Sequence, residues 1–271
     1  MEDVYSNIAE VDPAIQERIA SILELRASDP QQEEFLESYL KSVPFAERSK
    51  VLEIGCGTGP VTRALARCEL ISDVTGVDPS PVLLGYANAL SHHYPDVRFL
   101  QADARELPFE KDTFDAAVLH TSLCHIPGAD TVLSEAFRVL RPGGLLVVFD
   151  GDYAATSLAI DDNDPLEVVA RAAVKVIAHD RWLVRKLPWL IREAGFEVVR
   201  SRAYAYSAAC DADYMLTILD RGADALEAAG VIGRQLALAL KDEGRQRVES
   251  GRFFGLITYG NLLARKAVER S

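Results

Sequence analysis

The chain has few cysteines and no long apolar run. Its four cysteines, Cys56, Cys68, Cys124 and Cys210, are scattered and form no C-x-x-C pair, which fits reduced thiols and neither a disulfide framework nor a zinc site. No apolar stretch approaches the ~18 residues that a membrane helix needs. The N-terminal sequence MEDVYSNIAE is acidic and polar, unlike a signal or transit peptide. Together these features predict a cytoplasmic protein with no membrane partner.

Positive charge is also scarce. The 271 residues include 29 lysines and arginines but 41 aspartates and glutamates, a formal charge of −12. A wide electropositive face is therefore not expected, which disfavours nucleic acid and anionic membranes as partners. With 49% hydrophobic residues, the chain has ample apolar material for one sizeable core.

Short apolar segments alternate with helical patterns through the middle of the chain. Strands are expected at 51–55, 73–78, 97–103, 114–120 and 145–151, and helices at 60–68, 80–93 and 130–140. This alternation predicts a parallel sheet covered on both faces, that is, an α/β fold. Farther along, helices are expected at 165–178, 181–194 and within 211–250, and strands at 195–206 and 253–266. Residues 1–42 also have a helical pattern, with Pro13 and Pro30 as breaks.

Three glycines follow the first strand in VLEIGCGTGP. Glycines at such a turn allow the backbone to approach a ligand closely, although a tight strand–helix turn alone would also need them. The dinucleotide fingerprint G-x-G-x-x-G would require glycine where this chain has Pro60. Asp78 ends the second strand, where a carboxylate can accept hydrogen bonds from ribose hydroxyls, and Asp103 follows the third, within reach of an adenine amino group. The alternatives are that Asp78 is only an acidic loop residue and that Asp103 only caps a helix.

Five segments in this order resemble the class I S-adenosylmethionine-dependent methyltransferases, in the small-molecule branch with the ubiquinone and menaquinone enzymes. The segments are VLEIGCGTG, VTGVDPS, QADARELPF, FDAAVLHTSLCHIP and RVLRPGGLLVVFD. The resemblance implies a doubly wound seven-stranded sheet of order 3-2-1-4-5-7-6 with strand 7 antiparallel and a helical insertion before it. It also implies one domain over 1–271, with a helical cover at 1–42, a cofactor-binding core at 43–151 and substrate-side elements at 152–271.

The resemblance further implies S-adenosylmethionine as the cofactor and a set of residues around it. Gly55, Cys56 and Gly57 would pass close to its methionyl part, and Glu53 would support that loop. The other expected cofactor contacts are Asp78, Pro79 and Ser80 near the ribose and adenosine, Asp103 and Ala104 at the adenine, His120 and Thr121 near the sulfonium, and Tyr5 and Arg26 from a lid. Surface roles for Tyr5 and Arg26 are an open alternative.

Catalysis would rest mainly on alignment of the acceptor with the methyl group, with a base only if the acceptor must lose a proton. Histidine suits that task near neutral pH, and His120 and His125 follow the fourth strand; a buried histidine bonded to backbone is the alternative. The candidate acceptor contacts are His125, Asp150, Asp152, Tyr153 and His179. No metal is expected, since His120 stands where catechol methyltransferases carry an acidic ligand.

The leading hypothesis is methyl transfer to the oxygen, nitrogen or carbon of a small organic metabolite. HTSL stands after the fourth strand instead of an N-P-P-Y-type sequence, which disfavours methylation of a nucleobase amino group. A non-methylating relative that binds the same cofactor is the main alternative, and an NAD-linked oxidoreductase is a weaker one.

Overall fold

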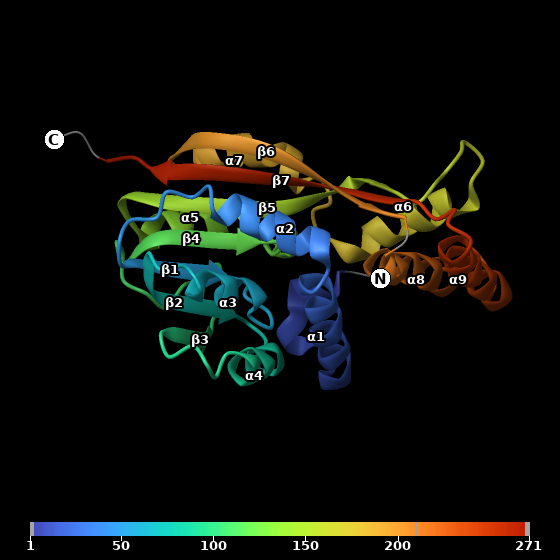
Figure 1. Cartoon of the computed structure of the whole chain (residues 1–271), viewed down its shortest axis with the longest axis horizontal. Helices are drawn as coiled ribbons and strands as arrows, with labels where there is room; N and C mark the ends of the chain where they lie inside the picture. Colours follow the sequence, from blue (N-terminus) through green and yellow to red (C-terminus); the bar gives the residue numbers. More distant parts are fainter. Residues whose placement is uncertain (1–2, 210, 269–271) are drawn as a thin grey trace.

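Seven strands form one sheet in a computed structural model that describes residues 3–209 and 211–268. The strands are β1 (Ser49–Ile54), β2 (Ile71–Asp78), β3 (Val97–Gln101), β4 (Phe114–His120), β5 (Leu140–Ser157), β6 (Phe196–Ala208) and β7 (Gly255–Lys266). Their order is 3-2-1-4-5-7-6, and β7 runs antiparallel to both neighbours. The predicted fold class, strand order and insertion are therefore confirmed (Figure 1).

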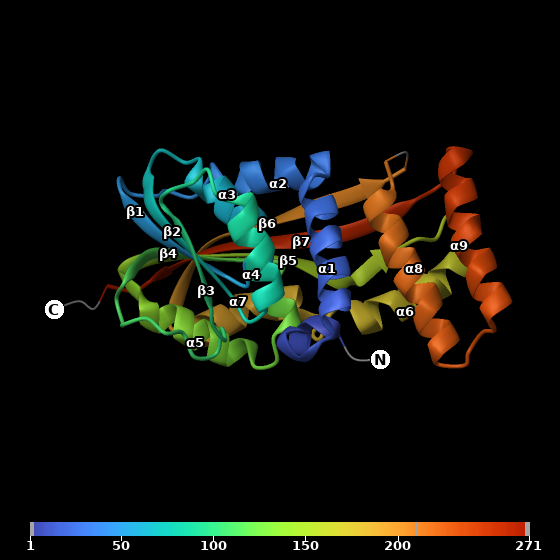
Figure 2. The same ribbon diagram turned by 90° about the horizontal axis from the view of Figure 1, so that it is seen from below.

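The central strands are buried because helices cover both faces of the sheet. The helices are α1 (Pro13–Ala27), α2 (Pro30–Leu40), α3 (Pro60–Ala66), α4 (Pro81–Leu90), α5 (Ala129–Val139), α6 (Pro165–Ile177), α7 (Leu183–Glu193), α8 (Asp213–Ala228) and α9 (Arg234–Glu249), with short 3-10 helices η1 (Val4–Glu10) and η2 (Leu123–His125). Helices α2, α3 and α4 lie on one face and α5 and α7 on the other, while α1 stands between α4 and α8 (Figure 2).

Proline begins several of these helices. Pro13, Pro30 and Pro81 occupy the first turn, each preceded by a residue whose side chain accepts a backbone hydrogen bond. A proline has no N–H to lose there, and its fixed φ suits the helix. Pro13 and Pro30 thus mark the starts of α1 and α2 within the helical cover.

The fifth strand is longer than the sequence pattern indicated. The fifth strand was expected at 145–151 but extends over Leu140–Ser157, because β7 pairs with it as far as Ser157. Strands β5, β6 and β7 extend past the ends of β1 and β4, and α6, α8 and α9 gather around this extension (Figure 1). This end of the molecule forms one side of the cavity described below.

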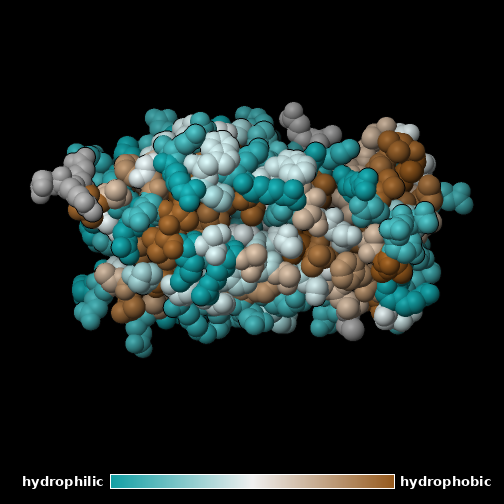
Figure 3. Space-filling model, turned by 90° about the horizontal axis from the view of Figure 1, so that it is seen from above, coloured by the Kyte–Doolittle hydropathy of each residue, from teal (hydrophilic) through white to brown (hydrophobic). Residues whose placement is uncertain are grey.

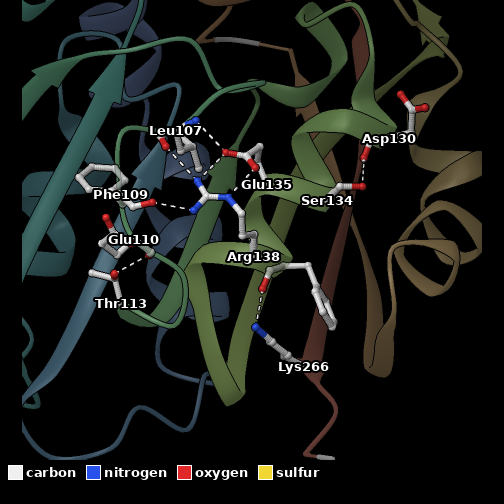
Figure 4. A network of polar contacts seen from close by, with 10 residues as sticks. Leu107, Phe109, Glu110, Thr113, Asp130, Ser134, Glu135, Arg138 and Lys266 are labelled. Carbon is white, nitrogen blue, oxygen red and sulfur yellow. Dashed lines mark hydrogen bonds and ion pairs between the residues drawn. The ribbon is translucent and has the colours of Figure 1, made fainter.

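Arg138 of α5 fixes the loop that follows β3. Its guanidinium donates to the carbonyl oxygens of Leu107 and Phe109 at 2.9 and 2.7 Å and to Glu135 at 2.7 Å (Figure 4). Glu135 in turn accepts from the Leu107 N–H at 2.8 Å. Buried polar backbone of an irregular loop is satisfied in this way, and the loop that starts near Asp103 is held against the sheet.

The surface view in Figure 3 shows separate apolar patches among hydrophilic residues. Within 3–209 and 211–268, none of the helices combines the length and the apolar character required to span a bilayer. Cys56, Cys68 and Cys124 are free thiols, and Cys210 lies outside the described residues.

Candidate active site

A cavity of about 360 Å³ opens at the carboxyl ends of the parallel strands. Its floor comes from the ends of β1, β2 and β4, and η1, α1 and α8 form its walls. This is the place where open α/β sheets bind ligands. The residues expected for the cofactor that line it are Tyr5, Arg26, Glu53, Gly55, Cys56, Gly57, Asp78, Pro79, Asp103, Ala104, His120 and Thr121.

The glycine loop after β1 has a backbone that other residues rarely adopt. Gly55, Gly57 and Gly59 have φ values of +76°, +53° and +80°, in the left-handed region. A Cβ on Gly57 would lie 2.9 Å from Leu23 Cδ1 of α1, and one on Gly55 would lie 2.5 Å from Ser122 Cβ. The loop therefore needs glycine both for its conformation and for space, and it presents bare backbone to the cavity.

Two buried carboxylates stand beside this loop. Asp78 accepts from the backbone N–H groups of Gly57 and Ser80, each at 2.9 Å, so it joins the turns after β1 and β2. Burial raises the pKa of Asp78 to about 6, against the opposing effect of those two hydrogen bonds. Glu53 accepts from the Thr62 hydroxyl, and burial raises its pKa to about 8. Both carboxyls line the cavity and can accept hydrogen bonds from hydroxyl or ammonium groups.

Asp103 lies at the β3 side of the cavity and is more exposed. Arg105 donates to it at 2.7 Å, and this hydrogen bond lowers the pKa of the carboxyl. The carboxylate also accepts from the Arg105 N–H at 2.8 Å. It is therefore partly engaged in its own loop, with Ala104 buried next to it.

His120 and Thr121 form the floor where β4 ends. The Tyr39 hydroxyl lies 2.8 Å from His120 Nδ1, and the imidazole stacks on Phe149 at 4.8 Å between ring centroids. Burial, followed by the charge of Arg26, holds the pKa of His120 well below its usual value, so this imidazole is neutral. Thr121 has φ of +49°, a strained angle for a β-branched residue and one that often marks a functional turn.

His125 meets the N-terminal segment at the cavity wall. Its Nδ1 lies 2.7 Å from Asp3 Oδ2, and its ring lies 4.5 Å from that of Tyr5. Ser6 donates to the His125 carbonyl at 3.0 Å. A carboxylate on Nδ1 fixes the ring and leaves Nε2 as the nitrogen able to accept a proton.

Arg26 and Arg221 bring positive charge to the cavity from α1 and α8. Within the described residues, neither guanidinium forms an ion pair with a carboxylate. Burial lowers the pKa of Arg26, but the phenols of Tyr214 and Tyr259 contribute to a net rise. The cavity thus contains two cationic groups that are available to anions.

Comparison with known proteins identifies this architecture. The family model described as "Methyltransferase domain" matches residues 52–148. A demethylmenaquinone methyltransferase of Lysinibacillus sphaericus is 29% identical over 185 residues, covering 63% of this chain and 79% of that protein. A 2-phytyl-1,4-naphtoquinone methyltransferase of Thermosynechococcus vestitus is 36% identical over 107 residues, covering 39% and 48%. Residues 52–148 thus form a class I methyltransferase domain. The chain is similar in sequence to quinone methyltransferases.

Solved structures agree on the fold. A SAM-dependent methyltransferase from Aquifex aeolicus has a TM-score of 0.56 at 15% identity, over 95% of this chain and 100% of that one. The [4+2]-cyclase SpnF has a TM-score of 0.60 at 20% identity, over 99% and 98%. The methyltransferase fold of this chain therefore includes its N-terminal cover and its α8–α9 insertion.

Four residues expected in the methyltransferase site do not line the cavity. Ser80 caps α4 by accepting from the Leu83 N–H at 3.0 Å. Asp150 is fully buried and accepts from the backbone N–H groups of Cys124 and Gly151 at 3.0 and 2.9 Å. Asp152 pairs with Arg185 at 2.9 Å. His179 is exposed, and its backbone N–H donates to Asp3 at 2.9 Å. The other acceptor candidates, His125 and Tyr153, both line the cavity.

Two residues of the site, one beside the cavity and one lining it, carried no local signal in the sequence. Asp3, which orients His125, lies in an N-terminal segment with no motif. Arg221 lies on α8, more than 60 residues beyond β5, and only the tertiary packing of α8 against α1 and α6 brings it to the cavity. The helical pattern of 211–250 predicted the helix but not which of its residues would face a ligand.

Proposed function

We propose that this methyltransferase transfers the methyl group of S-adenosylmethionine to an oxygen or carbon of a small hydroxylated aromatic acceptor, of the kind reduced quinones provide. The observation that carries the proposal is the pairing of His125 with Asp3 at the cavity wall beside the end of β4. A positioned base is useful only when the acceptor must lose a proton. Phenol and enol acceptors meet that condition, and the two relatives are named for quinone substrates.

The residues on the β1–β3 side of the cavity fit the cofactor. The bare backbone of Gly55 and Gly57 lines the cavity, and Asp78 offers a buried carboxylate for ribose hydroxyls. Asp103 lies where the adenine would be bound, and Arg26 is assigned to the cofactor carboxylate. When bound, S-adenosylmethionine supplies an electrophilic methyl group on a sulfonium.

The chain's own residues would then orient the acceptor and take its proton. His125 Nε2 receives the proton from the acceptor hydroxyl, while Asp3 holds the ring and stabilises its protonated form. His120, neutral and bonded to Tyr39, lines the cavity floor at the end of β4, where it would contact the cofactor. The N-terminal segment covers the site and excludes water, which favours alignment of the reacting atoms.

Labelled cofactor tests this function directly. The purified protein is incubated with methyl-labelled S-adenosylmethionine and 1,4-dihydroxynaphthalene under reducing conditions, and the organic extract is analysed for a labelled product. Label in an ether or ring-methyl product supports the proposal, and no transfer to this or other phenols contradicts it.

The same assay tests a second candidate function, cofactor binding without methylation, because a structural neighbour that matches nearly the full chain is named as a cyclase. A relative that binds the cofactor without methylating would show cofactor binding in calorimetry and no label transfer. An NAD-linked oxidoreductase would bind NAD in the same calorimeter, and the G-x-G-x-G spacing before Pro60 disfavours it.

A further inference from the structure

Arg221 occupies an unusual place on α8. The helix lies against α1 and faces the cavity, and Arg221 is half-buried in the cavity wall. A buried guanidinium loses hydration, and proteins normally compensate this loss with a carboxylate. Within the described part of the chain, no carboxylate forms an ion pair with Arg221.

The two acidic residues of α8 nearest to Arg221 in sequence form ion pairs with α9. Asp220 pairs with Arg245 at 2.8 Å, and Asp224 pairs with Lys241 at 2.5 Å. Both partners lie on α9, on the side of α8 away from α1 (Figure 2). Arg221 therefore faces the cavity while its acidic neighbours face the adjacent helix.

The groups around Arg221 are phenols. Its guanidinium carbon lies 5.9 Å from the centroid of the Tyr5 ring, and Tyr214 and Tyr153 line the same cavity. Phenols can donate hydrogen bonds to an anion, and their rings favour a cation, but they do not neutralise it. The cluster of Tyr5, Tyr153, Tyr214 and Arg221, which we call the tyrosine–arginine cluster, is thus built to receive an oxyanion.

The sheet order separates this cluster from the cofactor side. Asp78 and Asp103 follow β2 and β3, on one side of β1 and β4, whereas Tyr153 belongs to β5 on the other. The carboxylates that line the cavity are Glu10, Glu53, Asp78 and Asp103. Asp78 and Asp103 thus put acidic groups on the β2–β3 side of the cavity, whereas Arg221 puts an unpaired cation on its β5–α8 side.

We infer that the tyrosine–arginine cluster is an anion subsite for the methyl acceptor, so that the preferred acceptor is an aromatic hydroxyl compound bearing a carboxylate or a comparably acidic oxygen. The inference rests on the proposed function and narrows its substrate class. Arg221 would bind the fixed anion, while His125 takes the proton of the hydroxyl that is methylated. No covalent step is added to the reaction.

Two probes that differ by one carboxylate test the subsite. Binding of 1-hydroxy-2-naphthoate and of 1-naphthol is measured by calorimetry, with the protein saturated with S-adenosylhomocysteine. A charged hydrogen-bonded pair in a partly buried site predicts that the wild type binds the carboxylate at least about tenfold more tightly. Arg221→Met should remove this preference, and Arg221→Lys should retain part of it.

Matched measurements separate the possible outcomes. Arg234→Met changes an exposed arginine on α9 and should leave both affinities unchanged. All variants should bind S-adenosylhomocysteine as the wild type does, which also reports that the site is folded. Equal binding of the two probes by the wild type, or an Arg221→Met variant that loses S-adenosylhomocysteine affinity instead, would overturn the anion subsite. Absence of S-adenosylhomocysteine binding in the wild type would contradict the proposed function itself.

Discussion

Asp3 Oδ2 lies 2.7 Å from Nδ1 of His125, although 122 positions separate the two residues in the chain. The same oxygen accepts from the His179 N–H at 2.9 Å. One carboxylate therefore joins the N-terminal segment, the turn after β4 and the connection between α6 and α7. Because the carboxylate can only accept, His125 must donate from Nδ1, and its Nε2 is left to act as a base.

We expect His125→Gln to lower kcat by roughly 10²–10⁴-fold, the usual contribution of a general base. Asp3→Asn should lower kcat by a smaller factor, because an amide can orient the ring but does not stabilise its protonated form. The affinity for S-adenosylhomocysteine should hardly change in either variant.

Asp12→Asn provides the control for Asp3→Asn. Asp12 caps α1 by accepting from the Ala14 N–H at 2.8 Å, much as Asp3 accepts from the Tyr5 N–H at 3.0 Å, but Asp12 has no histidine partner. A kcat loss of the same size in both variants would mean that capping, not the His125 pair, matters. Rates of His125→Gln within threefold of wild type would exclude the base.

Gly57→Val should abolish cofactor binding and leave most of the fold intact. Its φ of +53° is strained for valine, and its Cβ would lie 2.9 Å from Leu23 Cδ1. Calorimetry with S-adenosylhomocysteine should show no binding, while the circular dichroism spectrum stays near that of the wild type. Gly85→Ala is the control, since a Cβ on Gly85 of α4 meets no atom within 4 Å. Normal cofactor binding by Gly57→Val would mean that the glycine loop is only a turn and not a binding loop.

The sheet and the glycine loop could be predicted from sequence because their causes are local. Buried parallel strands have near-continuous apolar runs, and capping residues such as Ser80 precede the helices that follow. The extension of β5 to Ser157 could not be read in this way, because pairing with β7, about 100 residues later, creates it.

Acidic residues near strand ends show how far the site could be predicted from the sequence. Asp78, Asp150 and Asp152 all lie close to the ends of strands as the sequence predicts them, yet only Asp78 lines the cavity. Asp150 is directed to the backbone of η2, and Asp152 to Arg185 on α7. The direction of such a carboxylate depends on partners that other helices and strands supply. Asp3 and Arg221 could not be predicted as site residues for the same reason, because only packing brings them to the site.

Asp78 should make cofactor affinity depend on pH. Burial raises its pKa from 3.8 to about 6, so the carboxyl becomes protonated in the free protein as the pH falls through that value. The ionised form is the better acceptor for two ribose hydroxyls, so affinity for S-adenosylhomocysteine should weaken about tenfold between pH 7.5 and 5. Calorimetry across this range measures the effect.

Two variants separate Asp78 from other titrating groups. Asp78→Asn removes the ionisation and should flatten this part of the pH profile. Asp78→Ala should weaken binding at pH 7.5 by about 2–3 kcal/mol, roughly 30- to 150-fold, since charge-assisted hydrogen bonds are lost. An unchanged profile in Asp78→Asn, or unchanged affinity in a folded Asp78→Ala, would remove this residue from the cofactor site.

Arg138→Met should destabilise the protein and loosen the loop that presents Asp103 and Ala104. The variant leaves the carbonyl groups of Leu107 and Phe109 without their donor and should cost about 1–3 kcal/mol of unfolding free energy, measured by urea denaturation. Affinity for S-adenosylhomocysteine should fall as well, because the adenine side of the cavity loses its support. Arg141→Met removes a more exposed ion pair with Asp115 and should cost less than about 1 kcal/mol. If Arg138→Met costs no more than Arg141→Met and binds the cofactor product normally, the contacts in Figure 4 do not hold the loop in place.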